Sequence, residues 1–465
     1  MPRPALRDLV VDIEEPGRDF ARGKAQRKVT PRRELAQLTP STHSATEILV
    51  AQNATRLPEL VPLRFARMLT NPFAFYRGSA AVMAADLAAG RSSGIRALCC
   101  GDAHVSNFGI YAAPDRALVF DLNDFDEAAA APAEWDLKRL VTSAIVAGQH
   151  EQYPPKAIRR IAERAVSAYR VGLDTMLGMP VLDRYYLRLE PERYRERLYK
   201  SSAAVLDRTL RRARKQTSSR VFGRIMTRGP DGTPRLRENP PVLQHIDIDA
   251  ETSLVESLTE YLDGVSPDVA MVLSHYQITD IALRVVGVGS VGTRCYLAIL
   301  TGPTGEPLIL QAKEASRSVL DEFGRVRQPS VLRDAIAAHG EGARVVIGQR
   351  ILQASSDVFL GTIRHDGRDF YVRQFHDMKG TVELEGMPPK VFGEYVISCA
   401  LSLARAHAQS ANASMLRGYV GNNDTVINAI VEWSYAYAEK SLDDFHRLRA
   451  AAKAGDIDVA DDPAR

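Results

Sequence analysis

Cysteine is scarce in this chain of 465 residues. The four cysteines, Cys99, Cys100, Cys295 and Cys399, lack the spacing of a metal-binding motif, so a reduced protein is expected. Long apolar runs are also missing: no stretch reaches the roughly 18 residues of a membrane-spanning helix, and the N-terminus lacks the apolar core of a signal peptide. We therefore expect a soluble, cytoplasmic protein without a membrane partner.

A strong charge of either sign is missing too. The net charge of +3, from 60 basic and 57 acidic residues, gives no argument for a nucleic-acid partner. A composition of 45% hydrophobic and 25% charged residues is ordinary for a globular protein. The length exceeds the size at which a single core keeps growing, so two domains or lobes are expected.

Composition divides the chain into parts. The run at 21–33 is basic, holds no acid and has little apolar periodicity, which indicates a disordered terminus or, alternatively, a contact to nucleic acid or another anion. Residues 229–241 are rich in proline and glycine and mark a boundary. The expected parts are a basic, partly disordered arm (1–45), a mostly helical part (46–245), a β-rich part (246–385) and C-terminal helices that pack back on the helical part (386–465).

The β-rich part carries the clearest strand signals. Residues 281–315 read as strand, glycine turn, strand, hairpin turn, strand. The segments 343–353 and 368–375 predict further strands, and 395–410 predicts an amphipathic helix. The sequence therefore predicts an α+β fold.

A glycine pattern, Gly287-Val-Gly289-Ser-Val-Gly292, lies between two of these strands. The pattern alone is weak evidence, and a dinucleotide-binding turn needs a helix directly after it, whereas 293–300 is strand-like. A glycine-rich loop between antiparallel strands is how protein kinases cover ATP phosphates, and a tight hairpin is the alternative. The candidate nucleotide-binding residues are Gly287, Gly289, Ser290, Gly292 and Thr293.

Lys313 lies among apolar residues on the next expected strand. A lysine there loses hydration unless an anion meets it, and a phosphate of ATP is one such anion. A lysine that extends its amino group back to solvent is the alternative. Either Glu322 or Glu341 could orient the amino group.

The segment GDAHVSN at 101–107 places Asp102 and Asn107 five residues apart on a loop after a short strand. A catalytic aspartate can orient a hydroxyl nucleophile while a nearby asparagine holds Mg²⁺. Asp121, at the end of the following strand, could bind the same metal because Mg²⁺ prefers hard oxygen ligands. His104 is either a catalytic residue or a structural hydrogen-bonding group. The carboxylates that could assist, or only solvate the turn, are Asp124, Asp126 and Glu127.

Together, GDAHVSN, the following VFDLNDFDEA and EWDLKRL resemble the core of the aminoglycoside phosphotransferase and choline kinase branch of the protein-kinase-like fold. More narrowly, FYRGSAAVM, GVGSVGTRCYLAIL and YVRQFHDMKG are similar to an uncharacterised bacterial family of unknown function grouped with these kinases. The match runs from about residue 45 to 450. It implies a two-lobed fold that uses ATP and Mg²⁺.

The resemblance also implies roles for individual residues. Asp102 would be the catalytic aspartate, with Asn107 and Asp121 as metal ligands. Asp124 is a further candidate ligand because of its place on the turn after Asp121, independently of the resemblance. Asp136 would brace the loop. Other motif residues could line a substrate site or form buried ion pairs: Arg77, Arg373, Asp377 and Lys379.

The order of the motifs differs from that of an ordinary kinase. The glycine loop and Lys313 follow the catalytic loop instead of preceding it, so we expect a circular permutation, with LARAHA at 403–408 in the helix that normally leads into the catalytic loop. If this is wrong, Lys313 and the glycine loop lose their assigned roles, whereas Asp102 and Asn107 keep theirs.

The leading hypothesis is an ATP- and Mg²⁺-dependent phosphotransferase acting on an unidentified hydroxyl-bearing small molecule or protein. A nucleotidyltransferase on the same fold and a non-catalytic nucleotide-binding pseudokinase are the alternatives. A nucleic-acid-binding role rests only on two basic segments, at 21–33 and 208–228. The sequence identifies neither the acceptor nor the oligomeric state.

Overall fold

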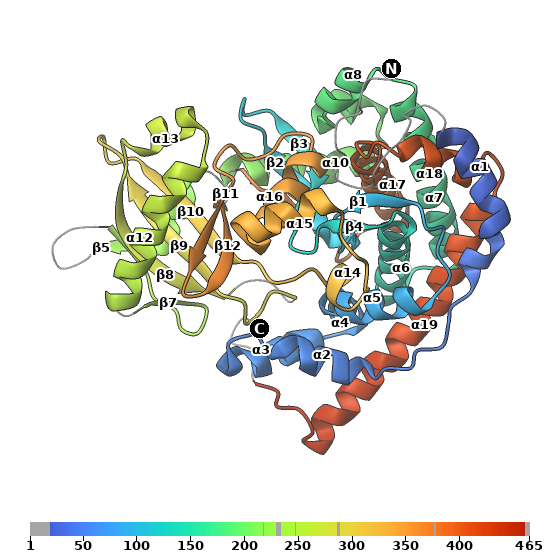
Figure 1. Cartoon of the computed structure of the whole chain (residues 1–465), viewed down its shortest axis with the longest axis horizontal. Helices are drawn as coiled ribbons and strands as arrows, with labels where there is room; N and C mark the ends of the chain where they lie inside the picture. Colours follow the sequence, from blue (N-terminus) through green and yellow to red (C-terminus); the bar gives the residue numbers. More distant parts are fainter. Residues whose placement is uncertain are drawn as a thin grey trace.

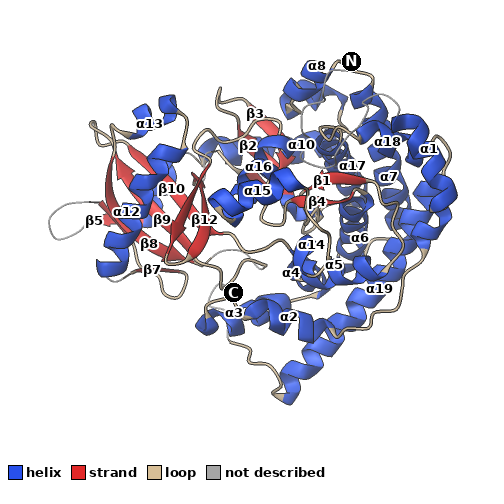
Figure 2. Cartoon of the chain, viewed as in Figure 1, coloured by secondary structure: helices blue, strands red, loops and turns tan. Residues whose placement is uncertain are grey.

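The computed structural model describes residues 19–216, 218–228, 234–246, 248–285, 289–375 and 378–460. The fold is mixed α+β, with 55% helix, 15% strand and several antiparallel sheets, which confirms the expected class. A helical part and a β-rich part lie beside each other (Figure 1). The largest sheet lies in the β-rich part, and the short strands lie among the helices (Figure 2).

The N-terminal segment is helical from Asp19 onward. We expected a partly disordered arm over 1–45; its described residues from 19 on include α1, which packs against α18 (Ala413–Val420), where Arg27 donates to the carbonyls of Gly418 and Tyr419. The helices of this segment are α1 (Asp19–Val29), η1 (Arg32–Ala36), α2 (Ala45–Asn53), η2 (Pro58–Leu60), α3 (Val61–Met68), α4 (Pro72–Gly78) and α5 (Ala80–Ala89).

Short strands follow and hold the loops predicted to be catalytic. β1 pairs with β4, and β2 pairs with β3 on one side and with β13 (Gly380–Thr381) on the other. The bounds are β1 (Arg96–Cys99), η3 (Val105–Asn107), β2 (Phe108–Ala112), β3 (Leu118–Leu122) and β4 (Ala129–Pro132).

The next helices complete the helical part. α6, α7 and the later helix α17 (Pro389–His407) pack together around the largest core cluster. On α10, Arg212 and Arg214 form ion pairs with Glu383 and Glu192, which balance part of the basic run at 208–228. The bounds are α6 (Glu134–His150), α7 (Pro155–Leu177), α8 (Val181–Tyr186), α9 (Pro191–Tyr194), η4 (Arg195–Arg197), α10 (Lys200–Lys215) and α11 (Ser218–Ile225).

A six-stranded antiparallel sheet forms the β-rich part, in the order β11-β12-β10-β9-β8-β7. The strands expected within 281–315 are present as β8, β9 and β10, and the strand expected at 368–375 is β12. The bounds are β5 (Met226–Arg228), β6 (Pro234–Leu236), β7 (Leu243–His245), β8 (Gln277–Arg284), β9 (Cys295–Thr301), β10 (Pro307–Glu314), β11 (Gly361–His365) and β12 (Arg368–Gln374).

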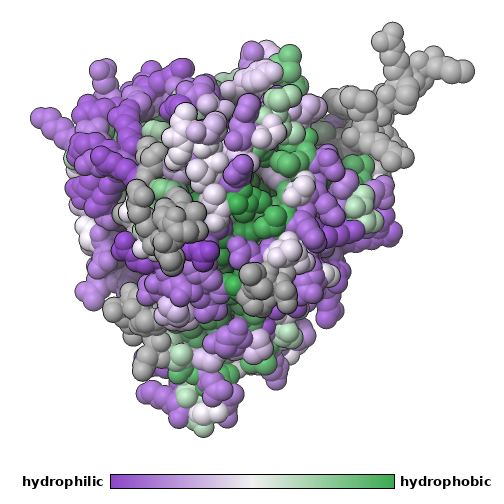
Figure 3. Space-filling view, turned by 90° about the vertical axis from the view of Figure 1, so that its left-hand side faces the viewer, coloured by the Kyte–Doolittle hydropathy of each residue, from purple (hydrophilic) through white to green (hydrophobic). Residues whose placement is uncertain are grey.

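Alternating side chains give this sheet two buried faces. On β9, Ala298 and Leu300 join a core with α12 (Ile248–Gly264) and α13 (Pro267–Leu273). Leu297 and Ile299 face the other way, into a core with Met226 and the partly buried Ile225. Viewed from this end, the surface is mostly hydrophilic around a hydrophobic area at its centre (Figure 3).

The strand predicted at 343–353 is wrong, because this segment is helix α16 (Glu341–Leu352). The run Val345-Val346-Ile347 favours a strand by local propensity. The segment nevertheless forms a helix, because packing against β12, β11 and α17 buries nearly every side of it and outweighs the local propensity. The helices between β10 and β11 are α14 (Val319–Glu322), which packs against α5 and β4, α15 (Ser330–His339) and α16.

Two more helices follow α17, namely α18 and α19 (Thr425–Ala454). α19 runs along α6 and α7 and also contacts η1, so the two ends of the described chain lie against the same helical core. Within the described residues, no helix combines the length and apolar character needed to cross a bilayer.

Candidate active site

A cavity of about 300 Å³ lies where the two parts meet. Its wall is built from the loops after β1 and β3, from the glycine loop, from the segment after β10 and from α2 and α4. Polar and charged side chains dominate the wall: Gln52, Thr55, Arg56, Arg77, Asp102, His104, Asn107, Asp124, Asp126, Glu127, Ser290, Thr293, Glu314, Ser316, Arg317 and Glu322.

Asp136 holds the GDAHVSN loop in place through hydrogen bonds to its backbone. Its carboxylate accepts hydrogen bonds from the backbone N–H groups of Cys100 (2.8 Å) and Gly101 (3.0 Å), and His407 Nε2 lies 3.3 Å away. Gly101 has φ of 83°, and a Cβ there would overlap the carbonyl oxygen of Glu127. Only glycine therefore lets the two loops approach this closely.

Asp102 lies in the cavity wall and is bound by Arg139. The Arg139 Nε atom donates to Asp102 Oδ1 over 2.7 Å, and Asn107 Nδ2 donates to the Asp102 carbonyl over 2.8 Å. Burial raises the pKa of Asp102 to about 6, and the Arg139 charge opposes that rise. Asp102 is therefore a carboxylate at neutral pH, with a proton affinity suited to general base work.

His104 lies beside Asp102 but does not hydrogen bond to it, since Nε2 is 3.6 Å from Asp102 Oδ2. Its Nδ1 atom is buried and has no partner among the described residues. Burial lowers the pKa of His104 well below its usual value, so the ring is neutral. These contacts give His104 a place in the wall but no direct link to the Asp102 carboxylate.

The structure places Asp121 away from the cavity. Its carboxylate accepts from the backbone N–H groups of Leu122 (2.9 Å) and Ala354 (2.7 Å) and lies 3.9 Å from Arg405. A buried carboxylate with these hydrogen-bond partners stabilises the fold. The carboxylate that lines the cavity beside Asn107 is instead Asp124, three residues further along.

Lys313 finds its partner in Asp126. The two side chains form an ion pair, Lys313 Nζ also lies 3.0 Å from Ser290 Oγ, and the Tyr371 hydroxyl donates to Asp126 Oδ1 over 2.7 Å. Neither expected glutamate pairs with the lysine: Glu341 binds Arg344 at 2.7 Å, and Glu322 stands in the cavity wall.

The glycine loop is attached to the helical part. Gly287 lies outside the described residues, whereas Gly289, Ser290 and Thr293 line the cavity. The Leu57 N–H donates to the carbonyl of Gly292 over 2.8 Å, and Gly292, with φ of 88°, lies against the Arg56 side chain. The loop is therefore anchored by residues just before η2.

Arg77 contributes a buried cation to this wall. Its Nε atom is buried and makes no hydrogen bond among the described residues, and burial lowers the pKa of Arg77 while the Asp102 charge opposes the change. Arg373 donates to Gln311 Oε1 over 3.0 Å, and burial lowers the pKa of Lys379 to about 8. Asp377 lies outside the described residues.

Sequence reasoning missed Arg139 and Arg56, and it gave Glu127 little weight. Arg139 could have been found, because it follows Asp136 by three residues on α6 and so lies on the same face, toward the loop. Burial raises the pKa of Glu127 to about 7, and its Oε2 atom accepts from the Val319 N–H over 2.7 Å. Nothing local marks Arg56 as a cavity residue, and the local motif placed Glu127 only among the carboxylates that could assist.

Among the described residues, one group of three donors lies close enough to share a metal ion: Cys99, Asp136 and His407. Asp136 is already bound to two backbone amides, and His407 Nδ1 contacts the Tyr169 hydroxyl at 2.7 Å. These buried residues therefore stabilise the GDAHVSN loop. In the cavity, the hard oxygen donors available to Mg²⁺ are those of Asn107, Asp124 and the neighbouring carboxylates.

Fold and cavity define an α+β protein with a carboxylate-rich cavity between a helical part and an antiparallel sheet. The chain belongs to the family described as "uncharacterized protein conserved in bacteria (DUF2252)", which matches residues 56–451. Comparisons with curated proteins and with solved structures found no match.

Proposed function

We propose that this protein is an ATP- and Mg²⁺-dependent phosphotransferase with a protein-kinase-like fold. The observation that carries the proposal is the meeting of two sets of residues at one cavity. Asp102, Asn107 and Asp124 come from loops of the helical part, and Lys313 reaches the wall from β10 by way of Asp126 and Ser290.

The order of the large sheet supports a kinase-like arrangement. β8 and β9 flank the glycine loop, β10 pairs with β9 and carries Lys313, and β12 pairs with β10 after the helices α14 to α16. Kinase-like proteins present their glycine loop and lysine from consecutive strands in this way, with a helix after the lysine strand.

A contact at the end of α17 supports the circular permutation. The Leu98 N–H on β1 donates to Ser410 Oγ over 3.0 Å, and Asn412 donates to the Arg96 carbonyl. The segment after α17 therefore lies against the strand that leads into GDAHVSN, although the two are more than 300 residues apart in sequence. A chain joined there would run from the helix into the catalytic loop.

In this proposal Asn107 and Asp124 would hold Mg²⁺, which would neutralise charge on the phosphates. The Asn107 amide nitrogen is already bound to the Asp102 carbonyl, so its oxygen is the atom for a cation. Asp121, an expected ligand, is replaced here by Asp124 because Asp121 is bound within the core.

Asp102 orients the acceptor hydroxyl and takes its proton as the hydroxyl oxygen attacks the γ-phosphorus. The new O–P bond forms while the bond to the ADP oxygen breaks, and the amides of the glycine loop and Lys313 bind the phosphates. Arg139 fixes the Asp102 side chain over 2.7 Å, which keeps one carboxylate oxygen directed away from the guanidinium and available to the acceptor.

Two labels of ATP test the proposal. Purified protein is incubated with Mg²⁺, a panel of metabolites and proteins, and either γ- or α-labelled ATP. Transfer of the γ label that disappears in Asp102→Asn supports a phosphotransferase. Transfer of the α label would instead identify the nucleotidyltransferase, and tight ATP binding with no transfer of either label would identify the pseudokinase.

A further inference from the structure

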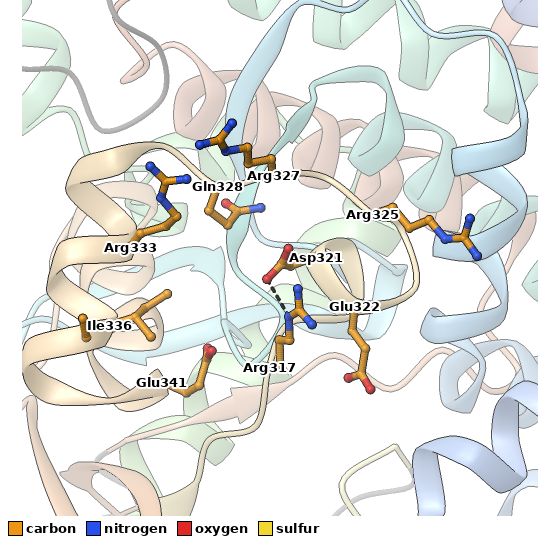
Figure 4. A pocket seen from close by; sticks show the side chains of 10 residues that line it. Arg317, Asp321, Glu322, Arg325, Arg327, Gln328, Arg333, Ile336 and Glu341 are labelled. Carbon is orange, nitrogen blue, oxygen red and sulfur yellow. Dashed lines mark hydrogen bonds and ion pairs between the residues drawn. The ribbon is translucent and has the colours of Figure 1, made fainter.

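A second depression, of about 580 Å³, adjoins the candidate active site. Both hollows have Arg317 and Glu322 in their walls, so they share one side. The rest of this wall comes from the loop between α14 and α15, from α15 and from the start of α16 (Figure 4).

Arginine dominates the charge of this wall. Arg317 is bound to Asp321 at 2.7 Å, whereas Arg325, Arg327 and Arg333 have no ion pair or side-chain hydrogen bond within the described part of the chain. In Figure 4, the guanidinium groups of Arg327 and Arg333 lie near each other at the upper left of the depression, whereas Arg325 lies at the right and points away from them.

The carboxylates nearby leave this charge unbalanced. Asp321 is held by Arg317, and Glu341 is held by the buried Arg344 at 2.7 Å. Glu322 is the remaining acidic group, and it stands in the wall shared with the candidate active site. The face formed by Arg327 and Arg333 is therefore positively charged.

The loop that carries Arg327 is anchored. The buried Gln328 accepts from the Ala130 N–H over 2.8 Å and donates to the Val326 carbonyl over 2.8 Å. Arg96 donates to the Arg327 carbonyl over 2.7 Å. These bonds tie the loop to β4 and β1, so the arginine backbone is positioned before any ligand arrives, which reduces the entropy cost of binding.

We infer that this depression binds a phosphate group, and that the acceptor of the reaction is a phosphate-bearing small molecule. The second half of the inference rests on the proposed function; the first half does not. Guanidinium groups match the geometry of phosphate oxygens and remain charged at all physiological pH values. The shared wall puts the bound phosphate beside the cavity that contains Asp102, where the hydroxyl of the same molecule would react.

Inorganic phosphate is the probe. Calorimetric titration of the full chain at constant ionic strength should show saturable binding, and Arg327→Ala/Arg333→Ala should weaken it by about tenfold or more because charge-assisted hydrogen bonds are lost. The matched control is Arg325→Ala, which removes one arginine from the same wall but from its opposite side, and which should keep the wild-type affinity.

A parallel titration with Mg-ATP separates the two proposals. Unchanged ATP affinity in Arg327→Ala/Arg333→Ala, together with lost phosphate affinity, supports a separate phosphate site. Wild-type phosphate affinity in the double variant, or an equal loss in Arg325→Ala, would overturn the inference. Absence of ATP binding by the wild-type chain contradicts the proposed function alone, since the phosphate titration is read without nucleotide.

Discussion

Lys313 and Asp126 form a buried ion pair that joins the sheet to the loop after β3. The two side chains are 6% and 23% exposed and are 187 residues apart in sequence. Burial alone would lower the pKa of Lys313 and raise that of Asp126, but the mutual attraction reverses both directions. The pair therefore holds together the two walls of the candidate active site.

Removing one partner of this pair should cost stability. Lys313→Met leaves Asp126 with Tyr371 and Ser290 but without its ion-pair partner, and a loss of about 2–4 kcal/mol in the free energy of unfolding is expected for a buried pair. Adding Asp126→Asn to Lys313→Met should recover part of that loss. Denaturant unfolding of both single variants and the double variant measures the coupling; purely additive losses would show that the pair contributes nothing.

Asp102→Asn should strongly slow phosphoryl transfer and leave the fold intact. The amide oxygen can still accept from Arg139, so the buried guanidinium keeps a partner, but the proton acceptor is gone. Loss of a positioned general base lowers the rate by about 10² to 10⁴-fold. Initial rates and thermal unfolding are compared with those of Asp115→Asn, an exposed aspartate bound to Arg188, which should behave as wild type. Full activity in Asp102→Asn contradicts the assigned role.

Activity should rise with pH through the pKa of Asp102. Burial raises this pKa to about 6, so below pH 6 the carboxyl group holds its proton and cannot take one from the acceptor. Above that pH the carboxylate is available and the rate reaches a plateau. The measurement is the rate at saturating Mg-ATP from pH 5 to 8, a range chosen to bracket the pKa by about one to two units. A flat profile would exclude Asp102 as the base.

Glu127 should make the protein less stable as pH rises. Burial raises its folded-state pKa from 4.5 to about 7, so the folded state keeps a proton that the unfolded state has released over this interval. Stability therefore falls between pH 4.5 and 7, by at most about 1.4 kcal/mol per pH unit. Glu127→Gln keeps an oxygen for the Val319 N–H but cannot titrate, so it should gain stability relative to wild type as pH rises. Parallel curves for the two proteins would contradict this assignment.

Substitution by asparagine should have different effects on stability and Mg²⁺ requirement at Asp121 and at Asp124. Asp121→Asn weakens bonds to the Ala354 amide and to Arg405, so it should lower stability with little effect on the Mg²⁺ concentration needed for activity. Asp124→Asn alters the cavity, so it should raise that Mg²⁺ requirement with a smaller effect on stability. Thermal unfolding and Mg²⁺ titration of the rate distinguish the two; reversed results would restore Asp121 as a ligand.

Gly101 and Gly305 provide a matched pair of glycines. Both have φ of 83°, so alanine brings similar backbone strain of about 1 kcal/mol at each position. At Gly305 a Cβ meets no atom within 4 Å, whereas at Gly101 it overlaps the Glu127 backbone. Gly101→Ala should therefore lose more unfolding free energy and all activity. Equal losses in the two variants would mean that the loops need not approach closely.

Local patterns were enough to predict four of the six strands of the large sheet, but not β7 or β11. Glycine turns and runs of β-branched residues mark β8, β9 and β10 within 281–315. The same signals failed at α16, because a segment buried on nearly all sides shows neither strand nor helix periodicity. Its Val345-Val346-Ile347 run then suggested the wrong element.

The candidate site was predictable as a set of motifs but not as a set of contacts. The sequence indicated a functional carboxylate near the end of β3. Which of several aspartates faces the cavity depends on how the strand packs, and Asp121 is bound within the core. The partner of Lys313 lies 187 residues away, and no periodicity links the two positions. Such pairings are set by the tertiary fold.

The brace beneath GDAHVSN has a consequence for synthesis. Asp136 leaves the ribosome 271 residues before His407, which contacts it, and Leu98 on β1 leaves 312 residues before its partner Ser410. Domains assemble in the order in which their segments emerge. The nascent helical part therefore lacks the His407 contact to Asp136 and the Ser410 contact to β1 until α17 and the segment after it have been made, and a truncated polypeptide ending before α17 would lack both contacts.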